Sequence, residues 1–342
     1  MNITVLAGGV SPEREVSLSS GSLIANALAE NGHRVLLLDL ALGYPDLPSD
    51  PTTLFGCAKD RRYFIGATEP NPDYLLRARK DGAVMGPHVA EICALSDAVF
   101  LALHGGAGEN GQVQAMLDCI GVPYTGSGYD GSLLAMDKDL TKRLLRDAGV
   151  PTPEWALCES DEINIDEWIA KVGFPCVVKP ADGGSSIGVS FAGTREKLVA
   201  AIERAKKYSR RLLVERKIVG RELTVGILGV RVLPPVEMIP KEGFYDYRNK
   251  YAGTTEELCP APISEEVNKR LSEYASRAFR ILRLRGYARF DFLLDKEERL
   301  WCLEANTLPG MTPTSLFPRE AAALGISYRA LCETLLQMAL NG

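Results

Sequence analysis

The sequence is poor in the features that mark several common protein classes. It has three histidines, none in an HExxH motif, and its eight cysteines include no CxxC pair, so a zinc site is not expected. No run of 18 apolar residues occurs, which predicts that no segment spans a membrane. The first residues, MNITVLAGG, have no basic region before their apolar stretch, which favours a strand over a signal peptide. These absences predict a reduced, cytoplasmic protein.

An excess of positive charge is also missing. Lys and Arg number 39 against 44 Asp and Glu, which gives a net charge of −5. A broad electrostatic contact with nucleic acid is therefore not expected, although a local basic pocket is allowed. The 342 residues suggest two or three domains, and 46% hydrophobic with 24% charged residues is ordinary for a globular chain.

The first 40 residues have the pattern of a βαβ unit. Residues 3–6 form a short apolar run, Gly8 and Gly9 interrupt it, and a helical stripe of apolar residues follows. Residues 35–39 are almost continuously apolar, which is typical of a parallel strand covered on both faces. The pattern predicts an α/β fold that begins with a parallel sheet.

The rest of the chain alternates between helical and extended patterns. Residues 41–95 hold six of the 20 prolines and no clear period, so we expect an irregular insertion with one helix near 89–95. The further elements expected are helices at 112–120, 132–148, 194–207 and 264–284, strands at 98–103, 122–125, 174–179, 212–215, 222–228, 231–239, 287–294 and 299–306, and helices at the C-terminus.

Two late strands direct oxygen ligands to one side. Because side chains alternate along a strand, Arg289 and Asp291 share one face of residues 287–294, and Glu304 and Asn306 share one face of residues 300–306. Carboxylate and amide oxygens without His or Cys suit a hard ion such as Mg²⁺, which usually also binds substrate phosphates. The equally weighted alternative is the solvated outer face of an edge sheet.

A glycine-rich loop follows a buried strand that ends at Lys179. In the segment 182–188, three glycines flank Ser185 and Ser186, and such a loop can close its backbone amides over a phosphate. The segment does not match the Walker A motif, and the N-terminal glycines do not match GxGxxG. A plain glycine-rich hairpin turn remains the alternative.

The loop at residues 244–251 is unusually aromatic. It places four aromatic residues among charged ones within eight positions, which is odd for a plain surface loop. We therefore expect it to act as a lid over a ligand.

Taken in order along the chain, eight sequence blocks resemble one family. The chain is similar to the D-alanine–D-alanine ligases of the ATP-grasp superfamily from residue 4 to about 318. The blocks are GGVSPEREVS at 8–17, LHGGAGENG at 103–111, PYTGSG at 123–128, MDK at 136–138, KPADGGSSIG at 179–188, YDYRNKY at 245–251, RFD at 289–291 and LEANTLPGMT at 303–312.

The resemblance implies three α/β domains with ATP held between the second and third. By similarity, these are an N-terminal parallel-sheet domain at 1–127 with the insertion at 41–95, a central ATP-grasp subdomain at 128–215, and a C-terminal subdomain at 216–342 that carries the metal-binding strands and the lid loop. Relatives are usually homodimers, so a homodimer is expected by analogy.

The resemblance also implies a set of nucleotide and metal contacts. Lys138 and Lys179 would contact phosphates, residues 215–218 would line the adenine, and Glu222 would hold the ribose. Asp291, Glu304 and Asn306 would bind two Mg²⁺, for which Mn²⁺ can substitute, with Glu304 bridging. The full set of implied ATP contacts is Lys138, Lys179, Gly184, Ser185, Ser186, Glu215, Arg216, Lys217, Ile218, Glu222 and Lys250. At Lys217 an aromatic residue often packs on adenine in this family, so this chain departs from the pattern there.

The implied amino-acid contacts come from three parts of the chain. Glu13 would recognise the ammonium of the first D-alanine, and His104 matches a residue of the same pocket. Arg289 and the Gly310 backbone would stabilise the tetrahedral centre. Ser315 and Leu316 would contact the second D-alanine. Glu13, Ser185 and Tyr251 match a hydrogen-bonded trio that closes the lid.

The implied activity is ATP-dependent ligation of two D-alanines through a D-alanyl phosphate, which releases ADP and phosphate and supplies peptidoglycan precursors. The alternatives are a D-alanine–D-serine ligase, a less favoured D-lactate ligase, a ligase of the same superfamily for another carboxylate, and a nucleotide-binding protein with a dead site. A dead site would be expected to lack Arg289 or a metal ligand, and none is missing.

Overall fold

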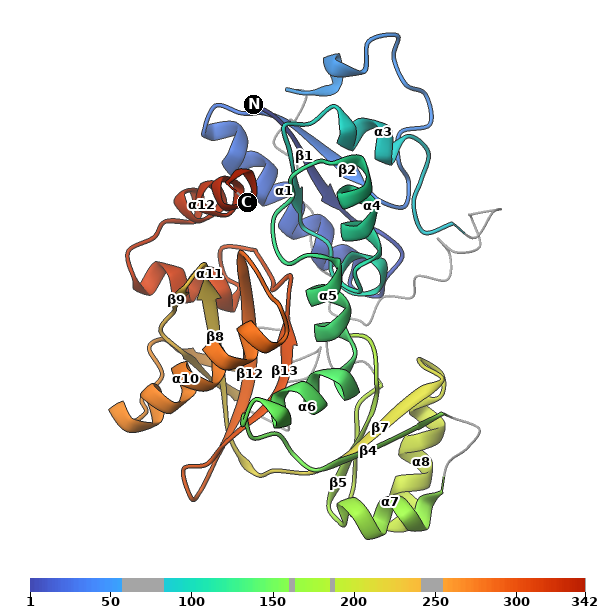
Figure 1. Ribbon diagram of the computed structural model, residues 1–342, viewed down its shortest axis with the longest axis vertical. Coiled ribbons are helices and arrows are strands. Elements are labelled where there is room, and N and C mark those ends of the chain that lie inside the picture. The colour runs from blue at the N-terminus through green and yellow to red at the C-terminus, as the bar shows by residue number, and fades with distance from the viewer. Residues whose placement is uncertain (57–82, 160–163, 185–187, 241–254, 342) are drawn as a thin grey trace.

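A computed structural model describes residues 1–56, 83–159, 164–184, 188–240 and 255–341. Its strands form three sheets that helices cover. The sheets follow one another along the long axis of the molecule, with the N-terminal sheet at one end (Figure 1). Every helix in these ranges is too short or too polar to traverse a lipid bilayer.

The first sheet is parallel, as the sequence predicts. It has the order β2-β1-β3, formed by Asn2–Ala7 (β1), Arg34–Asp39 (β2) and Ala98–Leu101 (β3). Its strands are buried because helices cover both faces, among them Arg14–Glu30 (α1), Val89–Ala94 (α3) and Gln112–Ile120 (α4). The predicted strand at 122–125 is reduced to a single bridge between Val99 and Tyr124.

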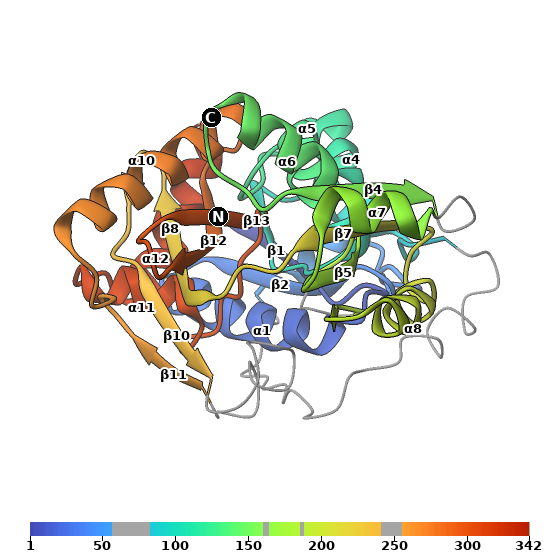
Figure 2. The same ribbon diagram turned by 90° about the horizontal axis from the view of Figure 1, so that it is seen from below.

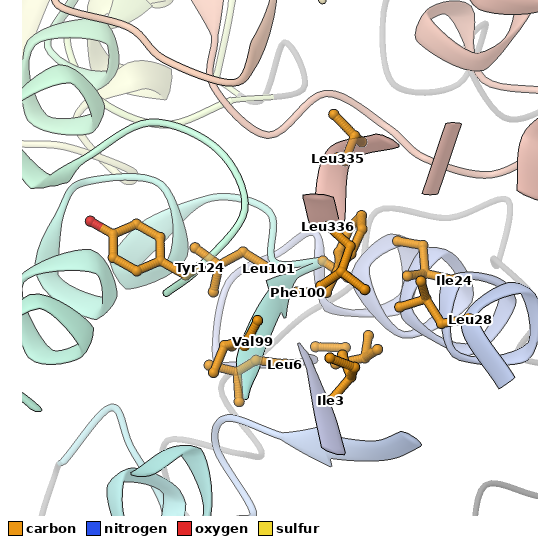
Figure 3. Packing of buried hydrophobic residues seen from close by; sticks show 14 of the residues in the cluster. Ile3, Leu6, Ile24, Leu28, Val99, Phe100, Leu101, Tyr124, Leu335 and Leu336 are labelled. Atoms are coloured by element: carbon orange, nitrogen blue, oxygen red, sulfur yellow. The ribbon is translucent and has the colours of Figure 1, made fainter. Parts of the chain in front are cut away.

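The last helix of the chain returns to this first sheet. Tyr328–Leu340 (α12) packs against α1, and Leu335 and Leu336 join Phe100, Ile24 and Leu28 in one core (Figure 3). The two ends of the sequence therefore share one hydrophobic core.

The second sheet is antiparallel and has four strands in the order β4-β7-β5-β6. Its strands are Trp155–Glu159 (β4), Arg211–Arg216 (β7), Cys176–Pro180 (β5) and Ser190–Ala192 (β6). Ile165–Val172 (α7) and Arg195–Ala205 (α8) bury one face, where Val178 and Val214 meet Trp168 and Leu198. The residues that alternate with them, such as Lys179 and Glu215, face away from those helices.

The third sheet is also antiparallel, in the order β11-β10-β8-β12-β13, with β9 paired to β8. Its strands are Gly220–Leu228 (β8), Arg231–Val232 (β9), Val236–Pro240 (β10), Thr255–Leu258 (β11), Tyr287–Asp295 (β12) and Leu300–Asn306 (β13). Glu265–Ile281 (α10) covers one face with the apolar stripe that the sequence predicts. Leu316–Ala323 (α11) lies on the opposite face. The second and third sheets lie next to each other (Figure 2), and residues of both line one cavity.

Two further sequence predictions of single elements are wrong. The predicted helix 132–148 is two helices, Tyr129–Met136 (α5) and Lys138–Asp147 (α6), because Asp137 takes an extended backbone and its carboxylate accepts the amides of Asp139 and Leu140. The predicted strand 231–239 is interrupted at Pro234 and Pro235, which have no amide hydrogen to donate. Short 3₁₀ turns at Pro51–Leu54 (η1) and Gly106–Gly108 (η2) complete the described elements.

Candidate functional site

A cavity of about 450 Å³ lies between the second and third sheets, and we call it the inter-sheet cavity. Most of the residues that the sequence assigns to a nucleotide meet here, although they come from five separate segments. The predicted residues that line it are Lys138, Lys179, Gly184, Glu215, Arg216, Lys217, Ile218, Glu222, Asp291 and Glu304. Ser185, Ser186, Lys250 and Tyr251 lie outside the described residues, as does the predicted lid at 244–251.

One wall of the inter-sheet cavity is fixed by a buried triad of charges. The Lys179 Nζ lies 2.7 Å from Glu215 Oε1, and the Lys142 Nζ lies 2.8 Å from Glu215 Oε2. Lys142 also donates to the Thr152 hydroxyl at 2.7 Å and is fully buried. Burial raises the pKa of Glu215, but Lys142 and Lys179 outweigh it and hold that pKa at about 2. Glu215 is therefore an ionised carboxylate clamped between two ammonium groups.

The sequence analysis did not select Lys142. The available signal was helical spacing, because Lys138, Lys142 and Leu145 follow the i, i+4, i+7 pattern and all three are buried on one face of α6. Burial lowers the pKa of Lys142, and the facing Glu215 carboxylate opposes that change.

Lys138 links α6 to the glycine-rich loop. Its Nζ donates to the Gly183 carbonyl at 2.5 Å. Burial lowers the pKa of Lys138, whereas the nearby Glu304 raises it and Lys179 lowers it further. Two lysines and the Glu304 carboxylate thus face one another where the glycine loop enters the cavity.

The opposite wall carries the acidic residues of β12 and β13. The register pairs Asp291 with Glu304 and Arg289 with Asn306, so all four side chains share one face, as the alternation predicts. Both carboxylate oxygens of Asp291 accept from Arg289 at 3.0 Å, and Asp291 also accepts from Asn306 at 3.1 Å and Thr224 at 2.6 Å.

This donor set fits a hard cation that shares its shell with phosphates. The described ranges contain no group of three or more His, Cys, Asp or Glu side chains that could hold a metal ion by themselves. Asp291, Glu304 and the Asn306 amide oxygen supply few protein ligands. That number suits Mg²⁺, which keeps several positions for water or phosphate oxygens.

A second cavity of about 390 Å³ adjoins the first, and we call it the N-terminal cavity. It lies where the carboxyl ends of β1 and β3 meet the glycine loop, and both cavities are lined by Asp182, Gly183 and Gly184. The Glu13 carboxylate lies between two loop glycines, Gly105 after β3 and Gly184 after β5. A Cβ atom at Gly105 would be 2.8 Å from Glu13 Oε2, and one at Gly184 would be 2.9 Å from it.

Two further titratable groups stand beside Glu13. His104 lines the N-terminal cavity. Burial lowers the pKa of His104, and the negative charge of Glu13 partly opposes this by raising it. Glu109 accepts from the Gly105 amide at 2.7 Å and the Leu308 amide at 3.3 Å, so it joins the first sheet to the segment after β13. Burial and Glu13 raise the pKa of Glu109 to about 8. The sequence analysis quoted the segment that contains Glu109 but gave that residue no role.

The predicted contacts for the second amino acid form a separate group at the start of α11. Ser315 precedes α11 and accepts from the Thr312 amide at 3.1 Å, and a Cβ at Gly310 would lie 3.1 Å from its hydroxyl. Leu316 is buried against Val236. In the part of the chain that is described, Arg289, Asn306, Gly310, Ser315 and Leu316 do not line either cavity.

Two antiparallel sheets face each other across a cavity that has lysines on one wall and acidic residues on the other, and a parallel sheet lies beside them. This arrangement defines the ATP-grasp architecture. Family models agree: "D-ala D-ala ligase N-terminus" matches residues 2–127 and "D-ala D-ala ligase C-terminus" matches residues 144–337. The chain therefore belongs to the D-alanine–D-alanine ligase family.

Individual relatives cover the whole chain. A D-alanine–D-alanine ligase of Synechococcus sp. (strain JA-3-3Ab) is 41% identical, covering 100% of this chain and 94% of the relative. That of Gloeobacter violaceus is 39% identical, covering 100% of both chains. A crystal structure of the Bacillus anthracis enzyme complexed with ATP has a TM-score of 0.76 at 29% identity, covering 100% of this chain and 98% of that one.

Proposed function

We propose that the chain joins two D-alanines to D-alanyl-D-alanine with the cleavage of ATP to ADP and phosphate. The observation that carries this proposal is the contact between the two cavities at Asp182, Gly183 and Gly184. A polyphosphate in the inter-sheet cavity and an amino acid beside Glu13 would meet at this border. Family membership and the ATP complex of a relative support the same assignment.

In the first half-reaction, a carboxylate oxygen of the first D-alanine attacks the γ-phosphorus of ATP. Lys138 and Lys179 face the phosphates and offset the charge that transfers, while residues 215–218 and Glu222 hold the nucleoside. Asp291, Glu304 and Asn306 would hold two Mg²⁺ or Mn²⁺, which screen the phosphate charges when bound. Glu13 binds the substrate ammonium, with His104 beside it in the pocket. The products are D-alanyl phosphate and ADP.

In the second half-reaction, the free amine of the second D-alanine attacks the acyl carbon. Arg289 and the Gly310 amide offset the charge on the oxygen of the tetrahedral centre, and phosphate then leaves. Ser315 and Leu316 hold the second amino acid at the start of α11. Because an acyl phosphate hydrolyses in water, we assign residues 244–251 as a lid over the site. In this proposal Glu13, Ser185 and Tyr251 hold the lid closed. The nucleotide is contacted by Lys250, Gly184, Ser185 and Ser186.

We also infer a cytoplasmic homodimer with three domains at 1–127, 128–215 and 216–342. Light scattering on the purified protein tests the dimer: one species at twice the mass of the 37.2 kDa chain is expected, and a monomer across the concentration range contradicts it.

The first experiment supplies ATP, Mg²⁺ and D-alanine and identifies both products by mass. ADP with D-alanyl-D-alanine is the expected result. D-Serine and D-lactate are offered in competition, and a dominant mixed dipeptide or depsipeptide would replace the second-substrate assignment. ATP binding without D-alanine-dependent ADP release would overturn the ligase assignment.

A further inference from the structure

Ser11 is a buried residue of the N-terminal cavity to which the proposed mechanism gives no role. It lies in the segment between β1 and α1, lines the cavity and is 8% exposed. A serine hydroxyl can donate one hydrogen bond and accept two, and burying a hydroxyl without partners costs free energy. The partners of Ser11 therefore indicate what this residue holds in place.

The Ser11 hydroxyl connects two segments that are distant in the sequence. It donates to the His104 carbonyl at 2.5 Å, and it accepts from the Glu13 amide at 3.2 Å. Glu13 and His104 line the same cavity as Ser11. One hydroxyl thus joins the backbone that carries the Glu13 carboxylate to the backbone that carries the His104 imidazole.

The start of α1 explains why the Glu13 amide needs this partner. Glu13 is the N-cap residue of α1, and its carboxylate does not cap the helix. In a capping box, the side chain of the third helical residue accepts from the N-cap amide. The third residue of α1 is Val16, whose side chain has no acceptor, so the Ser11 hydroxyl accepts from that amide instead. The Ser11 carbonyl also accepts from the Arg14 amide at 3.1 Å, which closes the turn before the helix.

A glycine allows the two segments to approach each other. Gly105 has a φ of +66°, and a Cβ atom there would lie 3.4 Å from the Ser11 hydroxyl and 2.8 Å from Glu13 Oε2. The hydroxyl and the carboxylate therefore lie close to the same residue, next to His104. A shift of either segment would change the distance between the Glu13 carboxylate and the His104 ring.

We propose that Ser11 is a positioning residue for the amino-acid pocket, and that its hydroxyl holds Glu13 and His104 in the arrangement that binds the first D-alanine. The inference rests on the proposed function, in which Glu13 binds the substrate ammonium. Without the hydroxyl, the Glu13 amide and the His104 carbonyl lose a shared partner, and both segments gain freedom to move. The nucleotide should be affected little, because Ser11 is not among the described residues that line the inter-sheet cavity.

Amide hydrogen exchange tests the positioning contact in the protein without ligands. Ser11→Ala removes the acceptor of the Glu13 amide, so exchange at this amide should be about tenfold faster than in the wild-type protein. Nuclear magnetic resonance or mass spectrometry of overlapping peptides measures the rate. Unchanged exchange at Glu13 would overturn the inference, whether or not the protein is a ligase.

Kinetics give a second readout that a general structural loss would not produce. Ser11→Ala should raise the KM for the first D-alanine about tenfold, as expected for the loss of one or two hydrogen bonds, with kcat and the KM for ATP changed less than about twofold. Ser11→Cys has a thiol, which is a weaker donor and acceptor, so its KM should lie between those of the wild type and Ser11→Ala. It takes the place of Ser11→Ala if that variant does not fold. An unchanged KM for the first D-alanine, or an equal rise in both KM values, contradicts the inference.

Ser96→Ala is the matched control. Ser96 is 9% exposed, and its hydroxyl also has two contacts, with the Thr4 hydroxyl at 2.7 Å and the Ile92 carbonyl at 3.3 Å. It precedes β3, at the end of the first sheet away from the N-terminal cavity. The variant should lose stability but keep the wild-type KM for D-alanine and the wild-type exchange at Glu13. A rise in this KM as large as that in Ser11→Ala overturns the inference. A wild-type protein that releases no ADP overturns the proposed function instead, and the exchange measurement still reports on Ser11.

Discussion

The two cavities neutralise their charges in different ways. In the inter-sheet cavity, Glu215 is paired with Lys142 at 2.8 Å and with Lys179 at 2.7 Å, so this carboxylate is neutralised by side chains of the protein. Beside the N-terminal cavity, burial and the Glu13 carboxylate disfavour the ionised form of Glu109 and so raise its pKa, and the Gly105 and Leu308 amides and the charge of Arg289 offset this only in part.

This difference indicates what each cavity requires from a ligand. His104, beside Glu13, has a pKa lowered by burial, so it adds no full positive charge near neutral pH. Among the described residues that line the N-terminal cavity, the charged side chains near neutral pH are therefore the carboxylates of Glu13 and Asp182, toward which the proposed substrate ammonium would be attracted. In the inter-sheet cavity, the ion pairs of the protein fix the positions of the charged side chains before a ligand binds, as preorganised electrostatic sites require.

The largest expected effect comes from removing one lysine of the buried triad Lys142, Glu215 and Lys179. Lys142→Met should lower the free energy of unfolding by about 3–5 kcal/mol, because removal of one partner leaves a buried carboxylate short of a counter-charge. It should also raise the KM for ATP, since Lys179 would be drawn closer to Glu215. Urea unfolding and initial-rate kinetics measure the two quantities.

The neighbouring Arg143 provides the matched control. It pairs with Asp139 on the same helix, but its side chain is 59% exposed. Arg143→Met should cost no more than about 1 kcal/mol, as is usual for exposed ion pairs. Equal losses in the two variants would contradict the view that the buried triad organises this cavity.

A moderate effect is expected from the buried Glu109 carboxyl beside the N-terminal cavity. The pKa of Glu109 is raised to about 8 from an ordinary value of 4.5. The folded protein therefore keeps a proton that the unfolded chain has released, and stability falls as pH rises from 4.5 to 8. The slope from one such group is at most about 1.4 kcal/mol per pH unit.

Glu109→Gln should remove this slope, so the variant gains stability relative to wild type between pH 5 and pH 8. Urea unfolding at several pH values measures the difference. Asp295→Asn is the control, because the Asp295 pKa is held near 2 by its hydrogen bonds against the effect of burial and contributes no slope in this window. A wild-type minus variant difference that is flat with pH would show that Glu109 is ionised throughout.

Sequence patterns predicted those parts of this site that depend on local periodicity. The alternation along residues 287–294 and 300–306 placed Asp291, Glu304 and Asn306 on one face, and the strand register confirms it. The apolar run before Lys179 predicted its buried strand, which the structure has at Cys176–Pro180. In β12 and β13 the strand period of two fixes the direction of each side chain.

The parts that the sequence did not predict depend on partners distant along the chain. Lys142 is buried because Glu215, more than 70 residues away, neutralises it. The Ser11 hydroxyl meets the His104 carbonyl, which lies 93 residues further along the chain. Similarly, the return of α12 to the first sheet depends on a shared core and not on local pattern. A single sequence contains these residues but does not show which of them meet.

The smallest expected effect concerns the edge of the inter-sheet cavity, where Lys217 departs from the family pattern. The Lys217 Nζ lies 4.5 Å from the centroid of the Phe191 ring, and both residues line the cavity. A partly exposed cation–π contact contributes about 0.5–1 kcal/mol, so Lys217→Ala should raise the KM for ATP roughly two- to fivefold at constant kcat.

Phe191→Ala should act similarly, and the double variant should be no worse than either single one, because each removes the same contact. Lys206→Ala, at the C-terminal end of α8 outside the cavity lining, is the control and should leave the KM unchanged. Fully additive losses would instead mean that Lys217 and Phe191 contact the nucleotide separately, and the ring would then take the place of the aromatic residue that is missing at position 217.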